Sequence, residues 1–249
     1  MPATIKIATV VDSSGVVGPA TPPLKLPAKP PAVALAVSET TAKPVAPSYW
    51  DAARKHLARK DRVMKRLIPQ FGDACLQSKG DAFSTLARSV VGQQISVKAA
   101  QTVWNRFVLL TATIAPSNVL KLKVDDMRAA GLSARKVEYL VDLALHFDSG
   151  AVHVKSWDEM DDEAIIAELI AIRGIGRWTA EMFLIFHLMR PDVLPLDDVG
   201  LINGIGKNYF SGDPVSRSDA REVAAAWAPY RSVATWYIWR SLDPLPVAY

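Results

Sequence analysis

The sequence predicts an all-α fold, and three observations favour it. Apolar residues recur three and four positions apart over most of the chain after residue 48. Short groups of Gly, Pro, Ser or Asp separate these segments. No alternating strand pattern competes over a comparable length, and no repeat at a solenoid period is found in the sequence. We therefore expect a compact bundle of about ten short helices.

The first 47 residues differ in composition from the rest of the chain. They hold about half of the 17 prolines, mixed with Ala, Val, Thr and scattered lysines, and they show no sustained period. Such a composition is typical of a disordered or polyproline segment. A secretory signal is not expected, because no unbroken apolar region follows a charged start. We expect a disordered tail over 1–47 and a folded domain over 48–249.

The expected helices follow from the spacing of apolar residues. The first two segments, 50–57 and 63–71, each place such residues on one face. Further segments with this spacing follow between punctuating residues. In chain order they are 81–91, 97–109, 117–129, 134–147, 162–170, 178–188, 199–206, 218–227 and 232–242.

The composition limits the class of protein. A net charge of +4 and a pI near 9.1 suit a polyanionic partner but also describe many ordinary enzymes. The single cysteine, Cys75, excludes a disulfide framework within the chain, a four-cysteine zinc site and a four-cysteine iron-sulfur cluster. No apolar run approaches the roughly 20 residues that cross a bilayer. We expect a soluble protein without a membrane partner, in a reducing cytoplasm.

The segment 165–180 predicts two helices joined by a tight turn that contains Gly174 and Gly176. Glycine readily supplies the positive backbone dihedrals and the bare surface that such a turn needs. The second helix would begin with exposed amide groups, which together with the helix dipole form a natural phosphate site. Phosphate contacts of this kind hold DNA without reading its sequence. An ordinary glycine corner between packed helices is the alternative.

A second segment follows about twenty residues later and reads Leu-Pro-Leu-Asp-Asp-Val-Gly over 194–200. Together with the hairpin it resembles the signature of the helix-hairpin-helix DNA glycosylase superfamily. Three further segments resemble its 3-methyladenine DNA glycosylase II branch: Ser-Val-Val-Gly-Gln-Gln-Ile-Ser over 89–96, Gly-Leu-Ser over 131–133, and Trp-Ala-Pro-Tyr-Arg-Ser over 227–232. The resemblance spans about residues 49 to 242 and implies two lobes, with the hairpin and Asp198 at the cleft between them.

The sequence departs from the family pattern in two places. Arg173 stands where many members have proline, which changes the rigidity of the turn but not the use of glycine. Some members fill the gap left by a flipped base with a bulky apolar residue, whereas this chain has Gln94 there, with Ile95 beside it. The identity of this wedge is therefore open between the two residues, and Gln94 is also a candidate for contact with the substrate.

The resemblance implies that Asp198 is the catalytic group. Breaking an N-glycosidic bond places positive charge on the sugar, and a carboxylate can stabilise that charge or activate water. A helix N-terminus favours the ionised form of the carboxylate. The alternative for Asp198 is a helix cap alone, and we expect Asp197 to be the cap or a bystander. Trp178 stands where bifunctional relatives have a lysine nucleophile, so hydrolysis alone is implied.

Aromatic residues indicate the class of substrate. The resemblance places Trp178, Met182 and Trp239 around the base pocket. An indole face attracts cations, and bases alkylated on ring nitrogens carry positive charge. The alternative is that these tryptophans belong to the core, as we expect for Trp227 and Trp236.

DNA contacts are expected mainly at the hairpin. The residues concerned are Gly174, Ile175, Gly176, Arg177 and Thr179, with Ile95 outside it. Lys98, Lys136 and Arg231 could also meet phosphates, or serve as solvated charges or structural pairs.

No cofactor is expected to be required. The four histidines show no HExxH spacing. Hairpins of the resembled family can hold a monovalent cation on backbone carbonyls, here those of Ile170, Ile172 and Ile175.

The expected function is that of a monofunctional DNA glycosylase, acting as a monomer on double-stranded DNA. It would flip out alkylated bases such as 3-methyladenine and 7-methylguanine and remove them by hydrolysis. Two alternatives stay open: a glycosylase for uracil, hypoxanthine or another lesion, and a non-catalytic DNA-binding module. The presence of Asp198 in its motif argues against the module.

Overall fold

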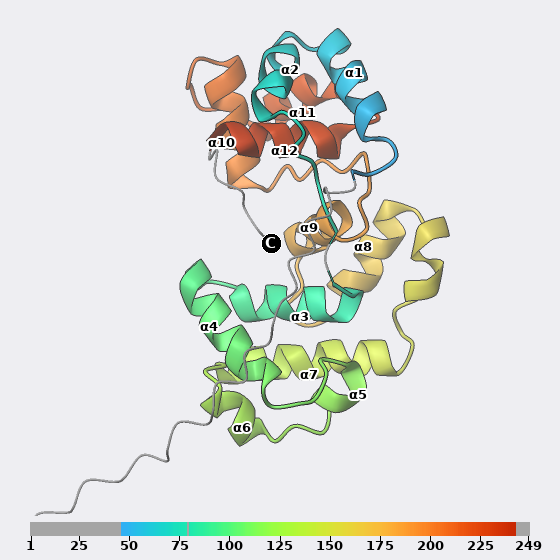
Figure 1. The fold of residues 1–249 in the computed structure, drawn as a ribbon, viewed down its shortest axis with the longest axis vertical. Coiled ribbons are helices and arrows are strands. Elements are labelled where there is room, and N and C mark those ends of the chain that lie inside the picture. Colours follow the sequence, from blue (N-terminus) through green and yellow to red (C-terminus); the bar gives the residue numbers. More distant parts are fainter. Residues whose placement is uncertain (1–45, 79, 243–249) are drawn as a thin grey trace, which may run out of the picture. The chain divides into compact units, whose positions relative to one another are not determined.

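The computed structural model describes residues 46–78 and 80–242, and within these ranges all regular secondary structure is helical. This confirms the predicted all-α class (Figure 1). The predicted tail lies outside the described residues except for its last two positions. The elements are α1 (Trp50–Lys60), α2 (Arg62–Leu67), η1 (Ile68–Phe71), α3 (Ala82–Gly92), α4 (Val97–Val108), α5 (Pro116–Val119), α6 (Val124–Ala129), α7 (Ala134–Asp148), η2 (Val154–Glu159), α8 (Asp162–Ile170), α9 (Arg177–Phe186), α10 (Val199–Tyr209), α11 (Arg217–Ala225) and α12 (Arg231–Leu242).

The predicted helices differ from the structure in three places. The expected helix 117–129 is two short helices, α5 and α6, because the chain is extended at Lys123, with φ −75° and ψ 140°. The expected helix 63–71 changes to the 3-10 helix η1 near Pro69, whose ring nitrogen has no hydrogen to donate. The 3-10 helix η2 was not predicted, since so short an element shows little periodicity.

The described helices form two contacting groups. One gathers the first and last helices, namely α1, α2, α10, α11 and α12, and the other comprises α3 to α9 (Figure 1). Helix α12 contacts α1, α2 and α10, and every residue from Ser232 to Ile238 is buried. Its apolar side chains are therefore spread around the whole helix rather than along one stripe. This arrangement agrees with the two lobes that the family resemblance implied.

One aspartate joins the early helices to the late ones. Asp61 caps α2, accepting hydrogen bonds from the amides of Val63 at 2.7 Å and Met64 at 3.0 Å. Its other carboxylate oxygen accepts from the hydroxyl of Tyr209 at 2.7 Å and the indole of Trp227 at 3.0 Å. Trp227 is fully buried, as predicted for a core residue.

None of the helices within residues 46–78 and 80–242 is both long and apolar enough to span a bilayer.

Candidate active site

The turn between α8 and α9 uses its two glycines for different reasons. Gly174 has a φ of +87°, and a Cβ placed there would lie 2.2 Å from the Cδ2 atom of Tyr139. Glycine is therefore required both by the backbone and by the tyrosine ring that packs against it. Gly176 has an extended backbone with φ −93° and ψ 170°, and an added Cβ would meet nothing within 4 Å. The predicted positive dihedral is confirmed for Gly174 and wrong for Gly176, which instead presents bare surface.

Helix α9 begins without a capping side chain. Its N-cap is Gly176, so the first amide groups of this ten-residue helix receive no hydrogen bond from a cap. The amide nitrogen of the Gln93 side chain donates to the carbonyl of Gly174 at 2.9 Å, which ties the end of α3 to the turn. The hairpin thus offers backbone donors and the positive end of a helix dipole.

Arg177, a predicted DNA contact, is held by two glutamates. Its guanidinium donates to both carboxylate oxygens of Glu163, from Nη1 at 2.9 Å, and to Oε1 of Glu181 at 3.0 Å. These bonds hold the pKa of Glu163 below its usual range, whereas burial raises the pKa of Glu181. The charge of Arg177 is therefore largely balanced within the protein.

Two other basic residues that were candidates for phosphates also have protein partners. The ammonium of Lys136 donates to the carbonyl of Val91 at 2.7 Å. Arg231 donates to both oxygens of Asp192, each at 2.7 Å. The structural-pair interpretation fits these residues. The ammonium of Lys98, in contrast, has no hydrogen-bond or ion-pair partner among the described residues.

The side chains of the remaining predicted DNA contacts differ in their exposure to solvent. The side chains of Ile175 and Thr179 are buried, so only their backbone can meet a ligand directly. Gln94 and Ile95 are both exposed, and Gln94 has a φ of +57°. Both wedge candidates therefore project from the short connection between α3 and α4.

Asp198 is the N-cap of α10 and receives three hydrogen bonds. Its Oδ1 accepts from the amide of Leu201 at 2.5 Å and from the indole of Trp239 at 2.7 Å. Its Oδ2 accepts from the indole of Trp178 at 2.9 Å. Of the two roles expected for Asp197, cap or bystander, the cap is wrong, because Asp198 caps the helix and Asp197 pairs with Arg217 at 2.6 Å. All three contacts place an N–H donor against an oxygen of Asp198, as in charge-assisted hydrogen bonds to a carboxylate.

The structure brings together the aromatic residues that were predicted to lie at the site. Trp178 on α9 is 40% exposed, and Met182, one turn further along, is buried. Trp239 on α12 stacks on Phe186, with ring centroids 5.5 Å apart and planes 14° apart. Both indoles direct an N–H to Asp198, which fixes the orientation of each ring at one edge.

Two supporting residues were missed in the sequence. A Cβ at Gly200 would lie 3.0 Å from Oδ1 of Asp198 and 3.3 Å from Trp239, so glycine leaves room for the carboxylate and the indole. Phe186 supports Trp239 from the last position of α9. The signal for Gly200 was its place two residues after Asp198, but only the packing of α12 against α10 explains it.

The residues described hold no group of three or more His, Cys, Asp or Glu side chains that could bind a metal ion. The carbonyl of Ile172 accepts a hydrogen bond from the amide of Ile175 at 3.1 Å, which leaves it one lone pair. Ile170 is the last residue of α8, where helix carbonyls lack partners within the helix. These carbonyl oxygens are compatible with binding of a cation, and the cation itself stays a prediction.

Comparison with known proteins places this geometry in a family. The family model described as "HhH-GPD superfamily base excision DNA repair protein" matches residues 87–229, which include the hairpin and Asp198. The chain belongs to the HhH-GPD superfamily. DNA-3-methyladenine glycosylase 1 of Schizosaccharomyces pombe is 34% identical to it, over 76% of this chain and 86% of that protein. A putative DNA-3-methyladenine glycosylase of Bacillus subtilis is 31% identical, over 65% of this chain and 59% of that protein.

Two solved structures with the names of 3-methyladenine-specific enzymes agree with this assignment. A DNA-3-methyladenine glycosidase from Bacillus halodurans has a TM-score of 0.71 at 34% identity, over 76% of this chain and 88% of that one. The Schizosaccharomyces pombe 3-methyladenine DNA glycosylase in complex with abasic DNA has a TM-score of 0.69 at 32% identity, over 79% of this chain and all of that one. The resemblance that the sequence motifs indicated is thereby confirmed.

Proposed function

We propose that this HhH-GPD protein is a monofunctional DNA glycosylase that removes alkylated bases, such as 3-methyladenine and 7-methylguanine, from double-stranded DNA in base excision repair. The observation that carries the proposal is the Asp198 carboxylate, held by the indoles of Trp178 and Trp239 at the beginning of α10. The relatives named above, which bear the name of 3-methyladenine glycosylases, support the same substrate class.

Asp198 would act on the sugar of a nucleotide that has been flipped out of the duplex. As the N-glycosidic bond breaks, its electron pair goes to the base and positive charge develops on the sugar. The Oδ1 atom is already engaged by Leu201 and Trp239, whereas Oδ2 has one donor, from the exposed Trp178. Oδ2 is therefore the oxygen better placed to stabilise the charge and to orient the water that adds to the sugar carbon.

The aromatic surroundings suit a cationic leaving group. Trp178 is 40% exposed, and an indole face attracts positive charge. A base alkylated on a ring nitrogen becomes neutral when it takes the electron pair, so it needs little help from a general acid. Trp178 also lacks an amine, so it cannot form the covalent intermediate that leads to strand cleavage.

The hairpin would hold the DNA beside this site through the backbone of residues 174–179. The uncapped amides of α9 and the bare surface at Gly176 suit a phosphate. Gln94 or Ile95 would enter the gap in the duplex, and carbonyls of the turn would hold a monovalent cation. The reaction itself uses no cofactor in this mechanism. The protein would act as a monomer in the compartment that holds the DNA: the nucleoid of a bacterium or the nucleus of a eukaryote.

The test compares release of 3-methyladenine and 7-methylguanine from methylated DNA by the parent protein and by Asp198→Asn. Asparagine caps helices about as well as aspartate, so the variant removes the charge and keeps the cap. We expect release to fall by about 10²- to 10³-fold, while binding of an abasic duplex persists. The control Asp197→Asn should release bases at the parent rate. Equal release by Asp198→Asn would refute the catalytic role, and equal release of uncharged hypoxanthine or uracil would refute the preference for cations.

A further inference from the structure

The positive charge of the chain is concentrated in its first two helices. Residues 50–67, which comprise α1, α2 and Asp61 between them, contain seven Lys or Arg and two Asp or Glu, a net charge of +5. The whole chain has a net charge of +4, so all other residues together carry a net charge of −1. An excess of this size on two adjacent helices is an electrostatic feature of this part of the molecule rather than of the protein in general.

Most of these cations have no acidic partner. Arg54 lies 3.7 Å from Asp51, and the carboxylate of Asp61 is used by the cap of α2, by Tyr209 and by Trp227. The others are exposed and form no ion pair with any described residue. They are Lys55, Arg59, Lys60, Arg62, Lys65 and Arg66, and we call them the α1–α2 surface.

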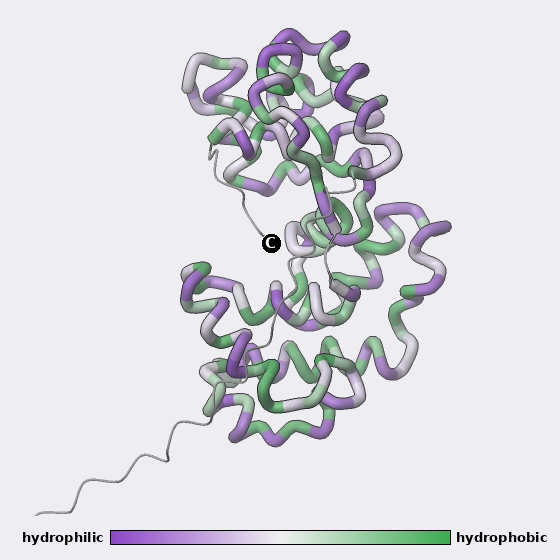
Figure 2. Tube along the Cα trace, viewed as in Figure 1, coloured by the Kyte–Doolittle hydropathy of each residue, from purple (hydrophilic) through white to green (hydrophobic). Residues whose placement is uncertain are grey.

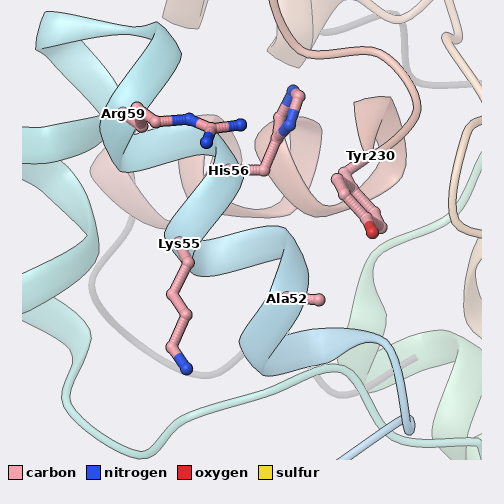
Figure 3. A pocket seen from close by; sticks show the side chains of 5 residues that line it. All are labelled: Ala52, Lys55, His56, Arg59 and Tyr230. Atoms are coloured by element: carbon pink, nitrogen blue, oxygen red, sulfur yellow. The ribbon is translucent and has the colours of Figure 1, made fainter.

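Two hollows at this surface are lined by cations and neutral groups. The first, of about 350 Å³, is lined by Lys55, Arg59, His56, Ala52 and Tyr230 (Figure 3). In Figure 3 the guanidinium of Arg59 points toward His56, whose Nε2 has no hydrogen-bond partner among the described residues.

The second hollow lies where α2 and η1 meet α10 and α12, and it has a volume of about 390 Å³. Arg66 and Arg240 line it together with the polar side chains of Gln70, Asn208 and Ser241. Neither hollow has a carboxylate in its lining. Cations with neutral donors and no acid are the groups that bind phosphate oxygens.

The α1–α2 surface lacks the apolar anchors of a protein interface. Large hydrophobic side chains are exposed at other places, such as Val97, Leu109 and Val199, but none lies in residues 46–71. Figure 2 shows α1 and α2 as largely hydrophilic. Interfaces between proteins usually depend on buried aromatic or aliphatic anchors, whereas binding to a DNA backbone depends on cations. The surface therefore favours nucleic acid over an acidic protein.

This surface is separate from the hairpin. Helix α12 packs against α1 and α2, and Figure 1 shows it between those two helices and α9. We propose that the α1–α2 surface binds the phosphate backbone of a second DNA segment while a first is held at the hairpin. Simultaneous binding would let the protein pass from one segment to another without a period free in solution. The inference relies on the proposed DNA substrate, but its measurement is binding rather than base release.

The test uses the full chain, saturated with a short duplex that contains an abasic-site analogue. Binding of a labelled, undamaged duplex is then followed by fluorescence anisotropy over a series of salt concentrations. The variant is Lys55→Gln, Arg59→Gln, Arg62→Gln and Arg66→Gln together. We expect the parent to bind the labelled duplex without releasing the first, and the variant to bind it at least tenfold more weakly. The slope of log K against log salt should fall by about 3 to 4, since each phosphate contact contributes about 0.9.

A matched control removes four exposed, unpaired cations elsewhere among the described residues. The control is Lys121→Gln, Lys123→Gln, Arg128→Gln and Lys155→Gln together, and it should bind the labelled duplex within twofold of the parent. Equal binding by both variants would overturn the inference, as would binding of the labelled duplex only by displacement of the first. Tighter binding of poly-glutamate than of DNA at equal charge would overturn it in favour of an acidic partner. Failure of the parent to bind the first duplex would instead count against the proposed function.

Discussion

The hairpin and the α1–α2 surface both suit a polyanion, but they present positive charge in different ways. At the hairpin, Arg173 pairs with Glu138 at 3.1 Å, and Arg177 is held by Glu163 and Glu181. The groups left for an anion are backbone amides, which have fixed positions and directions. On the α1–α2 surface the cations are long, exposed side chains without acidic partners. Backbone donors can position DNA against Asp198, whereas exposed cationic side chains attract it without fixing its register.

The largest expected effect concerns the turn between α8 and α9, and it tests whether the backbone there is held in one conformation. Gly174→Ala would place a methyl group 2.2 Å from the ring of Tyr139, at a φ of +87°. We expect the free energy of unfolding to fall by about 3 kcal/mol, from backbone strain and overpacking together. Urea denaturation measures this change.

A matched glycine separates the two causes. Gly150 also has a positive φ, +74°, but an added Cβ there would meet nothing within 4 Å. Gly150→Ala should therefore reduce the free energy of unfolding by only about 1 kcal/mol, the backbone contribution. Equal losses in the two variants would show that contact with Tyr139 costs nothing.

The second prediction concerns the surface at the beginning of α9. Gly176→Ala adds a methyl group into open space on an extended backbone, so the free energy of unfolding should change by less than about 0.5 kcal/mol. If DNA approaches the backbone here, binding of an abasic duplex should weaken about tenfold, or about 1.4 kcal/mol. Anisotropy with a short labelled duplex measures the affinity. Unchanged affinity would mean that the phosphate does not approach Gly176.

The smallest expected effect concerns Arg177, whose charge is paired with two glutamates. Glu163→Gln removes the charge that balances the exposed side of Arg177 and leaves Glu181 in place. We expect the affinity for a short duplex to rise about threefold, within the usual range for an exposed ion pair. The control Glu222→Gln removes a carboxylate on α11 that has no partner among the described residues. Equal gains in both variants would indicate a general charge effect and would weaken the contrast between the two regions.

Local features of the fold could be predicted from the sequence, because periodicity and glycine report on nearby backbone. Segments such as 97–109 and 134–147 came within one residue of α4 and α7, and Gly174 has the expected positive φ. The break at Lys123 was missed because apolar residues continue through it: Leu120 and Leu122 pack against the core from a turn.

The contacts of the site depend on pairs that are distant in the sequence, and spacing could not supply them. Trp239 lies 41 positions from Asp198, and its hydrogen bond exists only because α12 packs against α10. The pairing of Arg177 with Glu163 likewise requires α8 and α9 to lie side by side. The basic residues of α1 and α2 are visible in the sequence, but the lack of acidic partners is a property of the fold.

The hydrogen bonds of Asp61 and Trp239 limit how short a functional fragment of the chain can be. The segment by which the family is recognised, 87–229, contains the hairpin and Asp198 but neither of these residues. A protein shortened to that segment would leave the hydroxyl of Tyr209 without its acceptor, at a cost of about 1–3 kcal/mol if it stayed buried. The carboxylate of Asp198 would also lose the hydrogen bond that the indole of Trp239 donates to its Oδ1 atom. A working fragment must therefore extend past the recognised segment in both directions, to include α1, α2 and α12.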